Sequence, residues 1–492
     1  MNCWRFFDIC RKLTTQDPPK RPIFSLVRWL SPCIQHGMFK IWRCSESGST
    51  LLEHTPAKLI GMLGSLLLSL VLGGCHTSKP EPTSLTYFRL GWSQPDDLPG
   101  TEPLPQQFTR ETGIRVRDLP VPETTLDQLE LSRRLLKQIG SGPDVLNIDV
   151  IWPGVLEPDL VDLRHDLADE INSLEPQLLQ SYAAKGKLVA IPYTVQVGVL
   201  QYRSDLLREY GYQHPPRTWD ELETMAARIQ SGERAKGNKD FWGYVWQGAA
   251  AEALTCNAIE WQAAQGGGRI IESNRTISVN NPAAIRSWQR AKRWIGWISP
   301  PSVLAYQELD SINAFDQGAA AFVRVWGGAS ITRIGLFGQV HWRNSLAPSK
   351  TGYTSIPGGP LGWSGTLGGS GLAVSQHSSH RKEAIELIRF LIRAQIHSNQ
   401  VEESAVVNQS ELQSLPSVSN ASRSSEEVVR TRLVIRPSTE TGSHYEQIAR
   451  AYIDAVHSVL TGEKPAPQAA AALEEKLVRI TGFKTGPPLK GD

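Results

Sequence analysis

This 492-residue chain has few cysteines, few recognisable catalytic motifs and almost no excess of one charge, and each shortage excludes a class of function. Four of the six cysteines precede Cys75, which leaves Cys75 and Cys256 for the rest of the chain, too few for a disulfide framework. No CxxC pair or HExxH segment occurs, so a structural zinc site has little support and we expect no metal and no cofactor. The chain also lacks the esterase motif Gly-x-Ser-x-Gly, and its glycine runs at 266–268 and 358–359 lack the Lys-Ser/Thr of a phosphate loop. We expect Cys256 to be a buried, small hydrophobic residue of a helix.

The formal net charge of +2 hides a difference between the two parts of the chain. Residues 1–75 hold nine Lys and Arg against four Asp and Glu, whereas residues 76–492 hold 42 against 45. A weakly acidic body lacks the basic surface on which nucleic-acid binding depends, so nucleic acid is not an expected partner. The hydrophobic and charged fractions of 40% and 20% are those of a soluble globular protein. The length suits two domains and a targeting segment.

The targeting segment lies between Lys58 and Cys75, where 16 uncharged and mostly apolar residues form a stretch typical of a signal-peptide core. It ends in Leu-Gly-Gly-Cys at 72–75, which resembles the bacterial lipobox and predicts lipidation of Cys75. The polar residues 76–84 then read as a tether. The alternative is an uncleaved membrane anchor with a chance cysteine, for which the span is short. Residues 1–57 are an N-terminal extension, and we expect translation to begin further in, with Met38 a candidate start.

The body alternates between expected strands and expected helices. Strands are expected at 86–90, 114–116, 145–151, 195–202 and 320–325, and helices at 104–112, 126–139, 253–264, 283–298, 381–396, 445–460 and 467–480. Thr218 and Glu221 have the spacing of a capping box that starts a further helix. We expect residues 407–428 to be a surface loop or a weak helix. This alternation predicts βαβ units with helices on both faces of a sheet.

Tryptophan is abundant, with twelve residues after Cys75. A sugar ring offers C–H groups on its faces and hydroxyls at its edge, so its site needs flat aromatic surfaces beside carboxylates, amides and arginines. Asp149 with Trp152, and Arg324 with Trp326, provide both at the ends of expected strands, where open α/β sheets place ligands. For most of the tryptophans we expect core packing instead, above all for Trp288, Trp294 and Trp297 on one helix. A glycosidase pair of Asp149 with Glu157 or Asp159 is the catalytic alternative.

Seven segments resemble the family-1 solute-binding proteins of sugar ABC importers, most closely the trehalose/maltose-binding branch. They occur in order at 143–152, 202–207, 216–222, 229–234, 241–248, 254–261 and 366–369. The resemblance implies a periplasmic-binding-protein-like α/β fold of type II, with two lobes joined by a hinge of crossing strands. One lobe would comprise residues 85–194 with about 346–400, and the other residues 195–345 with about 401–485.

The resemblance also implies a set of ligand-binding residues. Asp149 would accept hydrogen bonds from sugar hydroxyls, Trp326 would stack on a ring, and Gly369 would offer its backbone. The full predicted set is Asp149, Trp152, Gln196, Trp246, Glu252, Arg324, Trp326, Gly369, Ser370 and Arg436.

The chain departs from the family pattern at four of these positions or their neighbours. Gln196 stands where the family has an acid, Gly328 where it has a tyrosine, Ser370 where it has an aromatic residue, and Ala251 where it has a tyrosine before Glu252. Each change removes a flat surface or a charge, which favours a different or smaller ligand, such as sucrose or glucosylglycerol, over maltose itself.

The predicted function is that of a lipid-anchored binding protein outside the cytoplasm, on the periplasmic side of the membrane or at the cell surface. It would capture a disaccharide or small glucoside such as trehalose, maltose, sucrose or glucosylglycerol, deliver it to the permease subunits of an ABC transporter, act as a monomer and catalyse nothing. The alternatives are a surface glycoside hydrolase and a non-transporting sensor or structural lipoprotein.

Overall fold

The computed structural model describes residues 83–90, 102–122, 125–329, 350–412 and 432–489. The chain divides into two compact units, Met1–Lys79 and Pro80–Asp492, and every described residue belongs to the second. The predicted signal peptide, Cys75 and most of the predicted tether lie outside the described residues, and Ser84 already belongs to a strand. In the described parts of the chain, no helix is long and apolar enough to cross a membrane.

The first part of the second unit is built from parallel strands, as the alternation of elements predicted. Strand β1 (Ser84–Phe88) pairs in parallel with β2 (Arg115–Leu119) and with β3 (Val145–Asp149). Helices α3 (Leu104–Thr112) and α4 (Thr125–Leu136) connect them. Gly113 ends α3 in the left-handed conformation, at φ 77°, which favours glycine.

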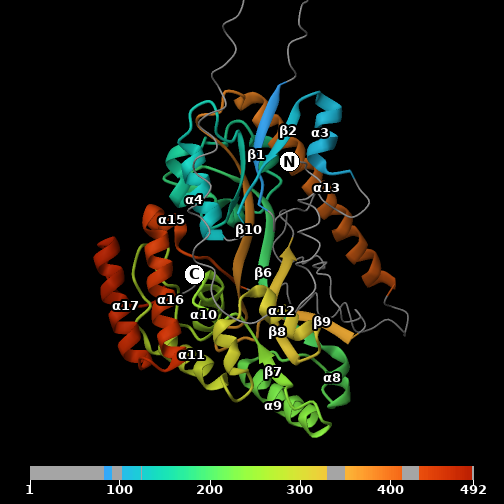
Figure 1. The fold of residues 1–492 in the computed structure, drawn as a ribbon, viewed down its shortest axis with the longest axis vertical. Helices are drawn as coiled ribbons and strands as arrows, with labels where there is room; N and C mark the ends of the chain where they lie inside the picture. Colours follow the sequence, from blue (N-terminus) through green and yellow to red (C-terminus); the bar gives the residue numbers. More distant parts are fainter. Residues whose placement is uncertain (1–82, 91–101, 123–124, 330–349, 413–431, 490–492) are drawn as a thin grey trace, which may run out of the picture. The chain divides into compact units, whose positions relative to one another are not determined.

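One sheet of nine strands runs through the whole unit, in the order β2-β1-β3-β10-β6-β8-β7, with β11 on β10 and β9 on β6 (Figure 1). Strand β10 lies antiparallel to both of its neighbours β3 and β6, so it joins the parallel strands to the rest of the sheet. The further strands are β6 (Ile191–Arg203), β7 (Trp242–Val245), β8 (Ala320–Ala329), β9 (Thr351–Ser355), β10 (Ser364–Val374) and β11 (Arg432–Val434).

Two large hydrophobic clusters pack against this sheet, and β6 contributes to both. The first core takes Ile191 and Tyr193 from β6 and includes residues of β1, β3, β10 and α13 and many from the segment 150–190. The second core takes Leu200 and Tyr202 from β6 and is built on the helices that follow it and on the C-terminal helices. The helices with their bounds are α8 (Ser204–Glu209), α9 (Trp219–Ala235), α10 (Glu252–Ala264), α11 (Pro282–Trp294), α12 (Glu308–Asp316), α13 (Arg381–Leu412), α16 (Tyr445–Thr461) and α17 (Ala466–Thr481).

Short elements lie between the two cores near the C-terminal end of β3. Helix α5 (Pro153–Leu156) follows β3 and packs on α15 (Ser438–Thr441), which follows β11. A Cβ on Gly154 would lie 2.1 Å from the Ser438 carbonyl oxygen, so the approach of the two backbones requires glycine at this position.

Two sequence-based expectations for the helices are wrong in part. Helix α11 ends at Trp294, four residues early, and Trp297 beyond it is 46% exposed instead of being packed in the core. Helix α13 continues to Leu412, well past the expected end at residue 396. Trp288 and Trp294 are fully buried as expected, and so is Cys256 in α10, where burial raises the pKa of its thiol to about 12.

The predicted capping box at the start of α9 forms with one shift in register. The Glu221 N–H donates to Thr218 Oγ1 at 3.2 Å, as expected. The Glu221 carboxylate, however, accepts from the Arg217 N–H at 2.7 Å, one residue before the cap.

The substitution Thr218→Ala should lower the free energy of unfolding by about 1 kcal/mol, because it leaves the N–H of Glu221 without its acceptor. Thermal and urea unfolding measure the change. The matched control is Thr224→Ala in the same helix, whose hydroxyl only donates to the Asp220 carbonyl. An equal loss of unfolding free energy in the two variants would show that the Thr218 cap contributes no more than the Thr224 hydroxyl does.

Candidate functional site

The register of β3, β10, β6 and β8 brings several predicted site residues onto one face of the sheet. Ser370 pairs with Asp149 on one side and with Thr194 on the other. Further along the strands, Gln196 pairs with Gly368 and with Gly328. Trp326 pairs with Gly198. Directly paired residues, and residues two apart on a strand, project to the same side of a sheet. We call this surface the central face, defined by Asp149, Thr194, Gln196, Trp326 and Ser370.

Glycines form the floor of the central face, and the indole of Trp326 lies on it. A Cβ on Gly368 would lie 2.8 Å from Cζ3 of Trp326, so the ring reaches from β8 across β6 to the backbone of β10. A Cβ on Gly198 would lie 1.9 Å from Oε1 of Glu260 and 2.6 Å from Nη2 of Arg324. Side chains at either glycine would displace the groups that cover the floor. The bare backbone therefore allows Trp326 to lie across the sheet.

Asp149 stands at the end of β3, at the opposite end of the central face from Trp326. Its carboxylate is largely buried, and burial raises its pKa to about 6 against the opposing effect of the Arg436 charge. The Ile151 N–H donates to Oδ1 at 3.1 Å, and the charge of Glu252 raises the pKa further. A carboxylate held in this way keeps lone pairs available for hydroxyl donors.

Arg436 connects this carboxylate to the start of α10. Its Nη1 donates to Glu252 Oε1 at 3.1 Å and its Nη2 donates to the Leu367 carbonyl at 3.2 Å, while its Nε is buried and has no acceptor within the described residues. Tyr445 of α16 donates its hydroxyl to the same Oε1 atom at 2.6 Å. Glu252 lies in the first turn of α10, where the helix dipole favours a negative charge. Asp149, Glu252 and Arg436 thus form one charged group beside the central face.

Strand β10 contributes two of the predicted residues, Gly369 and Ser370. Gly369 has φ 115°, and a Cβ there would lie 2.1 Å from the Thr194 carbonyl oxygen, so glycine is required. Its own carbonyl accepts from the Val150 N–H at 3.1 Å. The Ser370 and Thr194 hydroxyls lie 2.9 Å apart, and the Thr194 hydroxyl also accepts from the Ser370 N–H at 3.1 Å.

Three predicted site residues are core residues in this structure. Trp152 is fully buried in the first core. Trp246 is fully buried in the second core, where it packs edge-on against Trp261 and donates to Ser299 Oγ at 3.1 Å. Arg324 is fully buried in an ion pair with Glu260, 2.6 Å from Nη2 to Oε1. Trp152 and Arg324 were predicted from their position at the ends of expected strands and Trp246 from the family resemblance, but hydrophobic packing takes all the surface of the two tryptophans.

Four residues near the site were missed by the sequence reasoning: Tyr182, Thr194, Glu260 and Tyr445. Tyr182 is buried against Gly371, and the charge of Asp149 adds to the effect of burial in raising its pKa. Only Tyr445 had a usable signal, because it follows Arg436 by nine residues at the start of an expected helix. The others become visible only when strand pairing is known.

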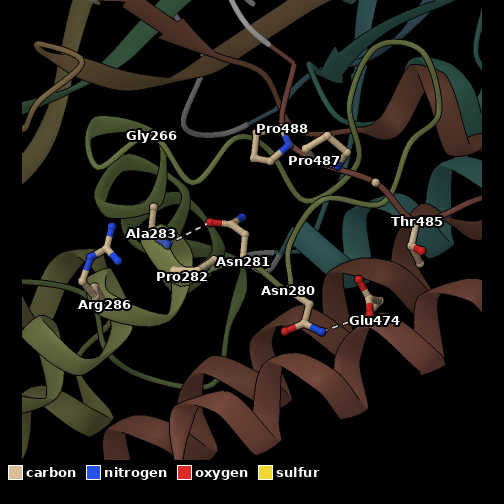
Figure 2. Close-up of a pocket in the computed structure, with 11 residues that line it drawn as sticks. Gly266, Asn280, Asn281, Pro282, Ala283, Arg286, Glu474, Thr485, Pro487 and Pro488 are labelled. Atoms are coloured by element: carbon tan, nitrogen blue, oxygen red, sulfur yellow. Dashed lines mark hydrogen bonds between the residues drawn. The ribbon is translucent and has the colours of Figure 1, made fainter.

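The structure also contains hollows away from the central face. One of about 620 Å³ is lined by the start of α11, by Glu474 of α17 and by the C-terminal residues 485–488 (Figure 2). Asn281 caps α11 there through the Ala283 and Ala284 N–H groups, and Asn280 donates to Glu474 at 3.0 Å. A second hollow of about 380 Å³ lies between α16 and α17. Neither is lined by a predicted site residue.

The substitution Asp149→Asn should remove a pH dependence of stability. The folded-state pKa of about 6 lies above the unfolded value of about 3.9, so the folded protein binds the extra proton between these values. The stability that this proton contributes is present below pH 4 and is lost as the pH rises through 6.

The amide introduced by Asp149→Asn keeps an acceptor for the Ile151 N–H and cannot ionise. The stability of this variant relative to the wild type should therefore rise by about 1–3 kcal/mol between pH 4 and pH 7, measured by urea unfolding. The control is Asp240→Asn at an exposed position. If the difference in stability between Asp149→Asn and the wild type were the same at pH 4 and pH 7, the raised pKa of Asp149 would be contradicted.

Comparison with known proteins identifies the family of this chain. The family model described as bacterial extracellular solute-binding protein matches residues 92–396. A probable ABC transporter-binding protein of Deinococcus radiodurans is 37% identical over 385 residues, which cover 76% of this chain and 89% of that protein.

Solved structures show the same fold. The maltose-bound MalE3 of T. maritima is 27% identical, with a TM-score of 0.66, over 81% of this chain and all of that one. An ABC transporter solute-binding protein of Agrobacterium vitis S4 with bound D-mannitol, 17% identical, has a TM-score of 0.60 over 81% of this chain and 98% of that one. These likenesses confirm the predicted type II periplasmic-binding-protein fold and the family resemblance. The chain therefore belongs to the bacterial extracellular solute-binding protein family.

Proposed function

We propose that this protein captures a small sugar outside the cytoplasm and presents it to the permease subunits of an ABC transporter. The observation that carries the proposal is the central face, where an indole, an amide, hydroxyls and a carboxylate lie on adjacent strands. These are the groups that a sugar needs, a flat apolar surface for its C–H face and polar groups for its hydroxyls. The relative of 27% identity that holds maltose supports the same ligand class.

In the proposed complex, Trp326 stacks on one sugar ring and Asp149 accepts hydrogen bonds from its hydroxyls. Gln196 and Ser370 offer polar groups between them, and Gly369 its backbone. Arg436 and Glu252 complete the polar wall. Trp152, Trp246 and Arg324 support this site from the two cores and are not proposed to touch the ligand.

A disaccharide or small glucoside suits the central face best. Among the residues that define this face, Trp326 is the one aromatic plate, because Gly328 and Ser370 take the places of aromatic residues on the same strands. One indole can stack on one sugar ring, so the second part of the ligand is held by hydrogen bonds to polar groups alone. Sucrose and glucosylglycerol, which join glucose to a non-pyranose unit, fit this arrangement better than maltose, and trehalose stays in the same class.

Strand β6, which contributes to both cores, and its neighbour β10 are the proposed hinge. We keep the predicted lobe boundaries, residues 85–194 with about 346–400 and residues 195–345 with about 401–485, as part of the proposal. Closing the lobes would bury the sugar, as hinge closure does in periplasmic binding proteins. The open and closed forms then differ in the surface that a monomer offers to the permease.

The alternative of a glycoside hydrolase finds little support in the carboxylates. Lys187 Nζ lies 2.8 Å from Oε1 of Glu157, and Lys137 Nζ lies 2.7 Å from Oδ2 of Asp159. The Lys187 hydrogen bond, with Lys185 beside it, lowers the pKa of Glu157, so only Asp149, with its raised pKa, would suit the role of general acid. Glu157 and Asp159, the two candidate partners, are both held in ion pairs with lysines. Binding without catalysis is the proposed activity.

The substitution Trp326→Ala should weaken sugar binding at least tenfold, about 1.4 kcal/mol, because the stacking surface is lost. Titration calorimetry with trehalose, maltose, sucrose and glucosylglycerol measures it. The matched control is Trp297→Ala, which removes a half-exposed indole away from the central face.

Absence of heat with every sugar, or equal binding by wild type and Trp326→Ala, would refute the proposed site and favour a sensor or structural lipoprotein. Release of free glucose from any of these sugars would favour the hydrolase.

We also propose that Cys75 carries a lipid that holds the protein at the membrane or cell surface. The support is the Leu-Gly-Gly-Cys sequence after an apolar segment. In a bacterial host fed radiolabelled palmitate, the wild type should carry label and sediment with membranes. Cys75→Ser should lose the label, whereas Cys44→Ser should keep it. Label in Cys75→Ser would refute the anchor.

A further inference from the structure

Beneath Trp326 lies a buried ion pair, which joins three strands and a helix. Arg324 and Glu260 are both fully buried, with Nη2 to Oε1 at 2.6 Å and Nε to Oε2 at 3.2 Å. Glu260 also accepts from the Thr366 N–H of β10 at 3.1 Å. Gly198 of β6 leaves the space in which the pair lies.

The guanidinium of this pair lies against the indole. Arg324 Cζ is 4.0 Å from the centre of the Trp326 ring, a cation–π distance. Gly368 supports the far edge of the same ring. One side of the indole is therefore set by a planar cation, and the planar cation is in turn held by its two hydrogen bonds to Glu260.

We infer that Glu260 and Arg324 are positioning residues, which fix the plane of the Trp326 indole for the stacking role that the proposed function gives it. A stacking ring that is already fixed loses less conformational entropy on binding than a mobile one. The pair acts through the indole and touches no ligand. The expected effect of the ion pair on sugar affinity rests on the proposed function, whereas its expected effect on the Trp326 indole does not.

The first test uses the protein without ligand. The chain is labelled with 5-fluorotryptophan, and the Trp326→Phe variant identifies the fluorine resonance of Trp326. In Glu260→Gln this resonance should move and broaden, because the guanidinium loses its charged partner. The control is Asp205→Asn in the first turn of α8, which breaks a similar bidentate pair with Arg203 at the end of β6. There the Trp326 resonance should stay in place.

A second variant separates positioning from stability. Replacing both members of a buried ion pair by hydrophobic residues of similar size often keeps or raises stability. The double variant Glu260→Leu with Arg324→Met should therefore fold and still move the Trp326 resonance. Maltose, used as the probe, should bind Glu260→Gln about tenfold more weakly than the wild type, and Asp205→Asn as the wild type does.

The outcomes distinguish the two proposals. If the Trp326 resonance moves in Glu260→Gln and the wild type binds no maltose, the result supports the positioning role and counts against maltose as a ligand. An unchanged resonance in either folded variant overturns the positioning role. Loss of resolved resonances for all tryptophans in both variants would assign the pair to stability alone and overturn it as well.

Discussion

The antiparallel pairing of β10 with both β3 and β6 is the constraint on which the rest of the structure depends. It turns a parallel α/β layer into a sheet that continues into the second core, and it sets the order of side chains on the central face. Ser370 faces Asp149 only because of this register, and a slip of one residue would turn each side chain to the other side of the sheet. Gly369, with its positive φ, permits the close approach of β10 to β6 at this point.

Charge is distributed along this sheet in two different ways. At one end, Arg324 and Glu260 are fully buried and joined by two hydrogen bonds, and Glu260 also accepts from the Thr366 N–H, so the pair acts on the groups packed around it. At the other end, Arg436 and Glu252 form a pair beside Asp149, and Glu252 keeps part of its surface exposed. Desolvation of Asp149 outweighs the nearby positive charge, so its pKa rises. The second group is available for recognition because it is incompletely neutralised.

Much of the fold could be predicted from the sequence, because local signals determine it. Helix α3 has the expected bounds, since its apolar spacing is followed by Gly113, and Thr218 accepts the expected hydrogen bond. Expectations failed where apolar spacing was given more weight than the end signals. Gly296, with φ 79°, follows the end of α11 at Trp294, although the apolar spacing continues past it, and α13 continues through a polar sequence that reads equally well as a loop.

The candidate site was harder to predict, because strand pairing assembles it. Asp149 and Trp326 were found from their position after apolar runs. The same argument selected Trp152, and the family resemblance selected Trp246, yet the cores cover the surfaces of both completely. A residue at the end of a strand can face either the sheet or the core, and sequence spacing does not distinguish these cases. Glu260, in the middle of an apolar helix, had no signal that linked it to Arg324 until β8 and α10 were placed.

The glycine floor limits how this scaffold can change its ligand. A methyl group at Gly198 or Gly368 would collide with the ion pair or the indole, so neither position is open to variation without loss of the stacking ring. Gln196 and Ser370 lie on the same face and already carry side chains. New preferences in descendants of this protein, natural or engineered, are therefore expected to arise at these two side chains while the glycines stay invariant.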